Sequence, residues 1–86
     1  MDLKTQANEI RGEISRVESL LTQLKARCKT ADLGLVPGQA MPDVGEMIAN
    51  VQLSYRHLED ARMRVGKVIQ AFEGGVSVYD RKEKSP

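Results

Sequence analysis

A seven-residue spacing of hydrophobic side chains in the second half of the chain constrains the fold more than any other feature. A second hydrophobic row falls three or four positions after the first, which is the spacing of one packing stripe on an α-helix. Asp43 and Glu46 match a D-x-x-E capping box at the start of the pattern, and Gly74-Gly75 end it. The sequence therefore predicts a long amphipathic helix over residues 43–73. The first row consists of Val44, Val51, Leu58, Val65 and Phe72.

A second pattern of the same kind occupies the first half of the chain and predicts a helix over residues 3–32. Its hydrophobic positions advance by alternating steps of four and three, an average of 3.5 residues that is typical of helices packed along their length. Charged residues such as Arg11 and Glu18 fall beside this stripe, and we expect them on a solvated face. The stripe consists of Leu3, Ala7, Ile10, Ile14, Val17, Leu21, Leu24 and Cys28.

The segment between the two patterns predicts a reversal of the chain. Pro37-Gly38 has the composition of a turn, and Gly34 is a candidate for the left-handed residue that ends the first helix. The segment also contains several apolar residues, so we expect it to lie against a helix surface or a neighbouring subunit. The predicted fold class is all-α, with two long amphipathic helices in an antiparallel hairpin and a short C-terminal tail. The single domain 1–86 divides into a helix over about 3–32, a connection over 33–42, a helix over about 43–73 and a tail over 74–86.

Both predicted helices carry more hydrophobic surface than one shared seam requires. Leu20 lies beside Leu21, and Met47 lies beside Ile48, so each stripe is wider than a two-helix contact can cover. Self-association would bury the remaining surface. The sequence therefore predicts a homo-oligomer.

Length and charge exclude several classes of protein. The 86 residues carry 13 basic and 12 acidic side chains, a balance that argues against binding to duplex DNA through phosphate neutralisation. The single cysteine cannot form an internal disulfide. No apolar run approaches the roughly 20 residues of a membrane span, and no N-terminal stretch has the apolar core of a signal peptide. We therefore expect a protein of the cytoplasm.

The sequence offers little for catalysis. One histidine and one distant cysteine do not form a metal site, and the adjacent Glu59 and Asp60 point to different sides of a helix. Cys28 lies on the apolar stripe, where a small buried hydrophobe is the commoner role. These features predict a non-enzyme without a cofactor or metal.

Binding is better provided for, because polar and cationic side chains gather in the middle of the second helix. Arg62 occupies a stripe position where an apolar residue is expected, so it needs a partner: Glu59, a carboxylate of another chain, or a phosphate held between subunits. Tyr55 and Tyr79 can stack on a base as well as pack at an interface. The candidate ligand-binding residues are Ser54, Tyr55, Arg56, His57, Arg62, Arg64, Lys67 and Tyr79.

The segment from Leu53 to Lys67 resembles the helical hairpin of phage anti-CBASS cyclic-nucleotide sponges, a segment that anti-Thoeris sponges share. The family pattern reads roughly S-L-A-x-T-x-L-E-x-A-x-M-W. Arg56 stands where this pattern has Thr, Ser54 where it has Ala, and Arg64 where it has Trp. The resemblance covers about a quarter of the chain. Residues that match in register are Leu53, Leu58, Glu59, Ala61 and Met63.

The resemblance implies a compact helical oligomer, in this family often a hexamer, that acts in the cytoplasm of the infected bacterial host. Such an assembly holds cyclic di- or trinucleotide second messengers between subunits without cutting them, so that host antiphage signalling is blocked. Family members that bind cyclic dinucleotides use aromatic and basic groups of the N-terminal helix. Here no aromatic residue precedes Tyr55, although the first helix offers the basic residues Arg11, Arg16, Lys25 and Arg27. A pocket lined by the second helix and suited to a cyclic trinucleotide is therefore an equal expectation.

A different class of function fits the same heptad pattern. A small coiled-coil protein, such as a phage regulator or assembly factor, would use these stripes to bind a helix of another protein. Composition does not separate this alternative from a nucleotide sponge. Binding to single-stranded nucleic acid is a weaker third interpretation, because the chain has three aromatic residues and a net charge of +1.

Overall fold

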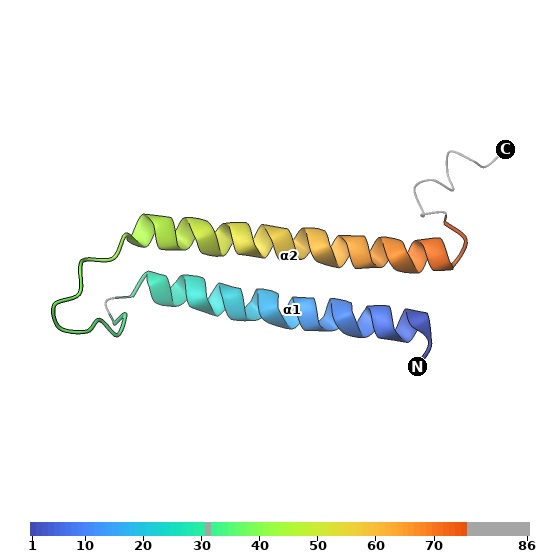
Figure 1. The fold of residues 1–86 in the computed structure, drawn as a ribbon, viewed down its shortest axis with the longest axis horizontal. Helices are drawn as coiled ribbons and strands as arrows, with labels where there is room; N and C mark the ends of the chain where they lie inside the picture. The colour runs from blue at the N-terminus through green and yellow to red at the C-terminus, as the bar shows by residue number, and fades with distance from the viewer. Residues whose placement is uncertain (31, 76–86) are drawn as a thin grey trace.

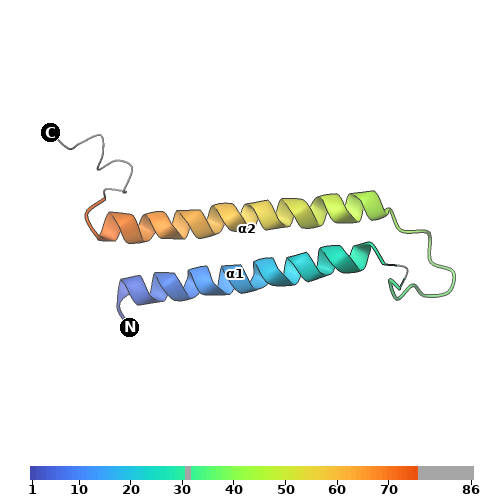
Figure 2. The same cartoon turned by 180° about the vertical axis from the view of Figure 1, so that it is seen from behind.

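The chain forms two long helices packed against each other. A computed structural model describes residues 1–30 and 32–75, with α1 at Leu3–Cys28 and α2 at Val44–Phe72 (Figures 1 and 2). No strand occurs in these two ranges. The predicted all-helical hairpin is therefore confirmed, whereas the tail beyond residue 75, with the candidate Tyr79, lies outside the described residues.

Side-chain caps begin both helices. Asp43 Oδ1 accepts a hydrogen bond from the Glu46 N–H at 3.0 Å, as the capping box predicts, while Glu46 Oε1 accepts from Asn50 instead of closing the box. Asp2 caps α1 in the same way, with its Oδ1 accepting from the Thr5 N–H at 2.7 Å. That hydrogen bond from Thr5 lowers the pKa of the Asp2 carboxyl group.

The first helix ends earlier than the sequence predicted. It stops at Cys28, whereas the prediction extended to residue 32. Thr30 Oγ1 donates a hydrogen bond to the Arg27 carbonyl at 2.8 Å, so this hydroxyl satisfies a carbonyl of the last turn and competes with continued helix. Gly34 does adopt a left-handed φ of 69°, but it lies beyond the C-cap Lys29 and does not end the helix.

The connection between the helices contains the predicted turn. The Gln39 N–H donates to the Val36 carbonyl at 3.1 Å, and Gly38 at the third position has a φ of 80°, which favours glycine. The apolar side chains of the connection were expected to lie against a helix surface or a neighbouring subunit, but Leu35, Val36 and Met41 are exposed in the hairpin. Among its described residues only Leu33 and Pro42 are half-buried, beside the adjoining helix ends. The connection and the helix ends enclose a small cleft of about 220 Å³ lined by Leu24, Arg27, Cys28, Leu33, Leu35, Gln39, Pro42 and Met47.

Contacts between the helices follow one order along the hairpin. Lys4 Nζ lies 3.4 Å from Glu73 Oε1 near one end. Farther along, the Arg11 side chain lies against Gly66, where an added Cβ would be 3.7 Å from Arg11 Cζ. Residues later in α1 therefore contact residues earlier in the second half of the chain, in keeping with the chain reversal in Figure 1.

The hairpin has a thin core of its own. In the part of the chain that the structure describes, only four hydrophobic side chains are buried: Ala7, Cys28, Val51 and Ile69. The molecule measures 67 × 31 × 15 Å and exposes 6800 Å², whereas a compact protein of 9.5 kDa exposes about 5,000 Å².

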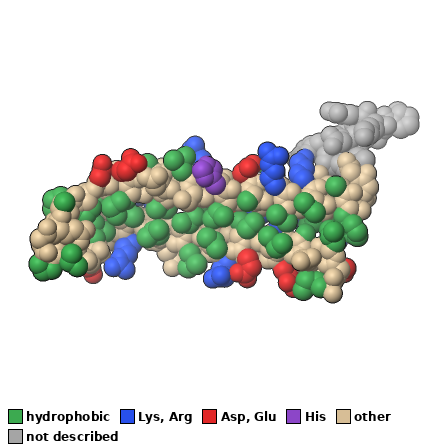
Figure 3. Space-filling view, in the orientation of Figure 1, with side chains coloured by type: hydrophobic (Ala, Val, Ile, Leu, Met, Phe, Trp, Pro, Cys, Tyr) green, Lys and Arg blue, Asp and Glu red, His purple; other side chains and the backbone are tan. Residues whose placement is uncertain are grey.

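One side of the hairpin presents an uncovered hydrophobic surface. On α1 the row of Leu3, Ile10 and Leu24 lies at one edge of the stripe and is exposed, and Val68 and Phe72 are exposed on α2. We call these five residues the apolar face. Figure 3 shows hydrophobic side chains in a band along the line where the two helices meet. The stripe on each helix is therefore wider than the seam, as the sequence predicted.

The opposite edge of the seam carries charged residues. Lys4, Arg11, Glu18 and Lys25 recur every seven residues on α1, on the other side of the stripe from Leu3 and Ile10. The contacts of Lys4, Arg11 and Glu18 with α2 all lie along this edge. We call it the polar edge.

Candidate functional site

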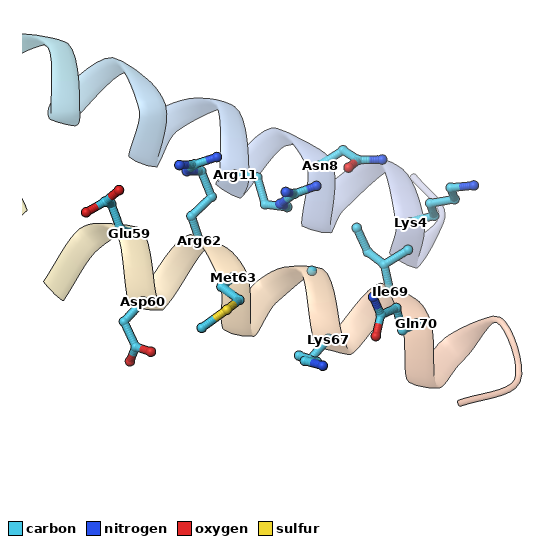
Figure 4. A pocket seen from close by; sticks show the side chains of 11 residues that line it. Lys4, Asn8, Arg11, Glu59, Asp60, Arg62, Met63, Lys67, Ile69 and Gln70 are labelled. Carbon is cyan, nitrogen blue, oxygen red and sulfur yellow. The ribbon is translucent and has the colours of Figure 1, made fainter. Parts of the chain in front are cut away.

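A cleft lies on the polar edge, between the start of α1 and the second half of α2. It has a volume of about 890 Å³, and cations from both helices line it (Figure 4). Figure 4 shows Arg62 and Glu59 pointing toward α1, whereas Asp60, Met63 and Lys67 point away from it. We call this the basic cleft. Its lining consists of Lys4, Asn8, Arg11, Glu59, Asp60, Arg62, Met63, Gly66, Lys67, Ile69 and Gln70.

Arg62 forms an ion pair with a buried carboxylate of α1, that of Glu18. Glu18 Oε1 lies 3.1 Å from Arg62 Nε, and the Glu18 side chain is only 6% exposed, whereas that of Arg62 is 37% exposed. The predicted partners of Arg62 were Glu59, another chain or a phosphate, so the partner found here corrects that expectation. Glu18 was expected on a solvated face; the approach of α2 covers it instead.

The Glu18–Arg62 pair is an ion pair with incomplete hydrogen bonding. Within the described residues, neither Glu18 Oε2 nor Arg62 Nε has a well-aligned hydrogen-bond partner, although both atoms are buried. The 3.1 Å separation therefore reflects electrostatic contact more than hydrogen-bond geometry. A pair of this kind costs desolvation, and only part of that cost is recovered.

Arg11 supplies a second guanidinium to the basic cleft. Its side chain lies beside Gly66 of α2, where an added Cβ would be in ordinary van der Waals contact with the guanidinium. Arg11 Nε is buried without a hydrogen-bond partner among residues 1–30 and 32–75. A buried donor without an acceptor is costly, so an anion in the cleft would have a donor ready for it.

The candidate residues predicted from the sequence do not converge on one point. Arg62 and Lys67 line the basic cleft. Arg64 is exposed, and its Nε lies 3.7 Å from Oδ2 of Asp60, four residues earlier on the same helix, so part of its charge is neutralised locally. Ser54 Oγ donates to the carbonyl of Asn50 at 2.9 Å within its own helix.

Two other candidates line a second cleft farther along the polar edge. Tyr55 and Arg56 face Lys25 of α1 across a space of about 340 Å³. Glu59 lines both clefts and so separates the two groups of cations. His57 is exposed and lines neither. Four of the eight candidates are therefore divided between two neighbouring clefts, and the other candidates on α2 line neither of them.

The described residues offer no metal site, because no group of three or more His, Cys, Asp or Glu side chains is placed to hold an ion. Cys28 is a free, buried cysteine at the end of α1, in agreement with its predicted role as a small hydrophobe. Neither helix is long and apolar enough to cross a membrane.

The first helix contributes residues that the sequence analysis did not select. Lys4, Asn8 and Arg11 line the basic cleft, and Glu18 is paired inside the seam. The signal that identifies them is the heptad spacing of Lys4, Arg11, Glu18 and Lys25 directly beside the apolar stripe. Charges at such flanking positions contact the partner helix in helical pairs.

Comparison of the chain with protein-family models, with curated proteins and with solved structures finds no match.

Proposed function

We propose that this chain is the subunit of a homo-oligomer that binds cyclic di- or trinucleotide second messengers and holds them intact. One observation carries the proposal: the hairpin leaves its apolar face uncovered on one side while cations line a cleft on the other. Assembly through the apolar face would leave the basic cleft accessible to a ligand.

The burial of side chains supports the assembly. Half-exposed hydrophobic residues such as Ile10 and Val68 contribute about 25 cal/mol for each Å² of apolar surface that a second subunit covers. Within residues 1–30 and 32–75 the hairpin buries only four hydrophobic side chains, so a second subunit on the apolar face would enlarge a thin core. A closed ring or bundle of antiparallel hairpins, with a hexamer as the expected size, covers this face in every copy.

The cations of the basic cleft support an anionic ligand. Arg11 and Arg62 come from facing helices, and the planar guanidinium of each fits two phosphate oxygens. Lys67 adds charge at the rim, and no ion pair occupies it within the described ranges. The resemblance of residues 53–67 to the anti-CBASS sponges supports a cyclic oligonucleotide as that ligand.

A decoy of this kind removes the second messenger by binding it, in proportion to the amount of decoy present. It needs no turnover and no cofactor, and it works in the cytoplasm of an infected bacterium, where the second messenger is made. Arg62 and Lys67 would contact phosphates in the basic cleft, while Tyr55 and Arg56 with Lys25 would contact a base or a further phosphate.

The exposed apolar face also favours a second candidate function, in which the hairpin binds a helix of another protein. The two functions differ in their response to nucleotides. A protein-binding hairpin gains no stability from a small anion, whereas a nucleotide-binding assembly is stabilised by mass action.

A thermal-shift panel separates these candidates. We expect one of cyclic di-AMP, cyclic di-GMP, cyclic GMP-AMP or cyclic tri-AMP to raise the melting temperature by at least about 5 °C, because a ligand at a hundred times its dissociation constant stabilises by about 2.7 kcal/mol. AMP at matched phosphate concentration is the control and should give no shift. Equal melting temperatures across the whole panel would favour the protein-binding hairpin.

A further inference from the structure

A buried carboxylate outside the lining of the basic cleft pairs with one of the cleft's cations. Glu18 is the one buried charged residue among those that the structure describes, and it contacts Arg62, which lines the cleft. Any phosphate that approaches Arg62 must compete with a carboxylate already in place. The strength of that competition then sets the affinity of the cleft.

The geometry of the pair indicates a contact that Arg62 can leave. Glu18 Oε2 has no hydrogen-bond partner among the described residues, and the Arg62 Nε–H is poorly aligned on Glu18 Oε1. Arg62 is also the more exposed partner, so its guanidinium can turn toward the cleft while Glu18 stays in the seam. A bidentate phosphate offers Arg62 better hydrogen bonds than this carboxylate does.

We propose that Glu18 is a positioning residue that restrains Arg62 and thereby lowers the affinity of the basic cleft for phosphate groups. The proposal rests on the anionic ligand proposed above and adds a regulatory element to that site. Free phosphate and other weak anions do not displace Glu18, whereas a ligand that also contacts Arg11 does. Glu18 thus selects for ligands that reach both guanidinium groups.

The test compares Glu18→Gln with Glu59→Gln, using inorganic pyrophosphate as the probe and ³¹P NMR titration as the measurement. Both substitutions remove one negative charge near the cleft, but within residues 1–30 and 32–75 only Glu18 forms an ion pair with Arg62. We expect Glu18→Gln to bind pyrophosphate at least about fivefold more tightly than the unaltered protein, and Glu59→Gln to change the affinity no more than about twofold.

The double variant Glu18→Gln/Arg62→Ala tests whether the increase in pyrophosphate affinity depends on Arg62. We expect this variant to lack the increase. Circular dichroism establishes that each variant is helical. If Glu18→Gln does not fold, Glu18→Met replaces it, since apolar replacement of a buried ion is tolerated. An equal gain in Glu18→Gln and Glu59→Gln, or a gain that persists without Arg62, overturns the proposal.

This test is independent of the nucleotide panel. Tighter pyrophosphate binding in Glu18→Gln with no cyclic nucleotide bound by any variant would support the role of Glu18 and contradict the proposed function. Retention of a cyclic nucleotide, with no difference in pyrophosphate affinity between the two Glu→Gln variants, would support the proposed function and contradict the role of Glu18.

Discussion

Replacing Ile10 and Val68 together by glutamate is expected to convert the assembled protein into single chains of 9.5 kDa. Both side chains belong to the apolar face, and they are 46% and 50% exposed in the hairpin, so neither is needed to fill its seam. In an oligomer each would be buried, and an unpaired carboxylate there costs several kcal/mol. Sedimentation equilibrium measures the mass directly.

Leu53→Glu is the matched control for this experiment. Leu53 is 49% exposed on α2 and lies outside the apolar face, so the same substitution should leave the mass unchanged. An unaltered protein that already sediments as a single chain, or a double variant that keeps the full mass, would contradict assembly through the apolar face.

Arg62→Ala is expected to lower the free energy of unfolding by about 3 kcal/mol, because it leaves the buried Glu18 carboxylate without a counter-ion. This value is at the lower end for broken buried pairs, since Arg62 itself is partly exposed. Urea denaturation followed by circular dichroism measures the change. The loss concerns the seam inside one hairpin, so it is separate from any loss of ligand.

A second substitution distinguishes the two roles of Arg62. Glu18→Gln/Arg62→Ala removes the stranded charge and should recover most of the stability while still failing to retain a cyclic nucleotide. Arg64→Ala is the control, because Arg64 is exposed and pairs only with Asp60 in the described ranges; it should change stability by less than about 1 kcal/mol. Full stability of Arg62→Ala alone would show that Glu18 reaches solvent when its partner is removed.

The helices could be predicted from the sequence because their evidence is local. Rows at seven-residue spacing, the Asp43 cap and the glycines at 74 and 75 each act within a few turns of one helix. The width of the stripes likewise predicted the uncovered apolar face. The end of α1 was placed too late because a single hydroxyl, that of Thr30, satisfies a carbonyl of the last turn.

The site could be predicted only in part, because it depends on which residues of α1 face which residues of α2. Arg62 was identified as a charge on an apolar stripe, but its partner Glu18 is 44 positions away in sequence and becomes buried only when the helices pair in this register. Arg11 at Gly66 depends on the same register. The sequence also did not show that Arg62 and Lys67 line one cleft while Tyr55 and Arg56 line another. The two clefts differ in which residues of α1 line them, and they share Glu59.

The central claim is that the assembled protein binds a cyclic oligonucleotide and returns it unchanged. The most direct measurement incubates the purified protein with cyclic di- and trinucleotides, removes free ligand by filtration, denatures the protein by heat and chromatographs what is released. The account predicts that one cyclic nucleotide is retained on the filter and recovered intact. Passage of every nucleotide through the filter, or recovery of a linear product, would contradict it.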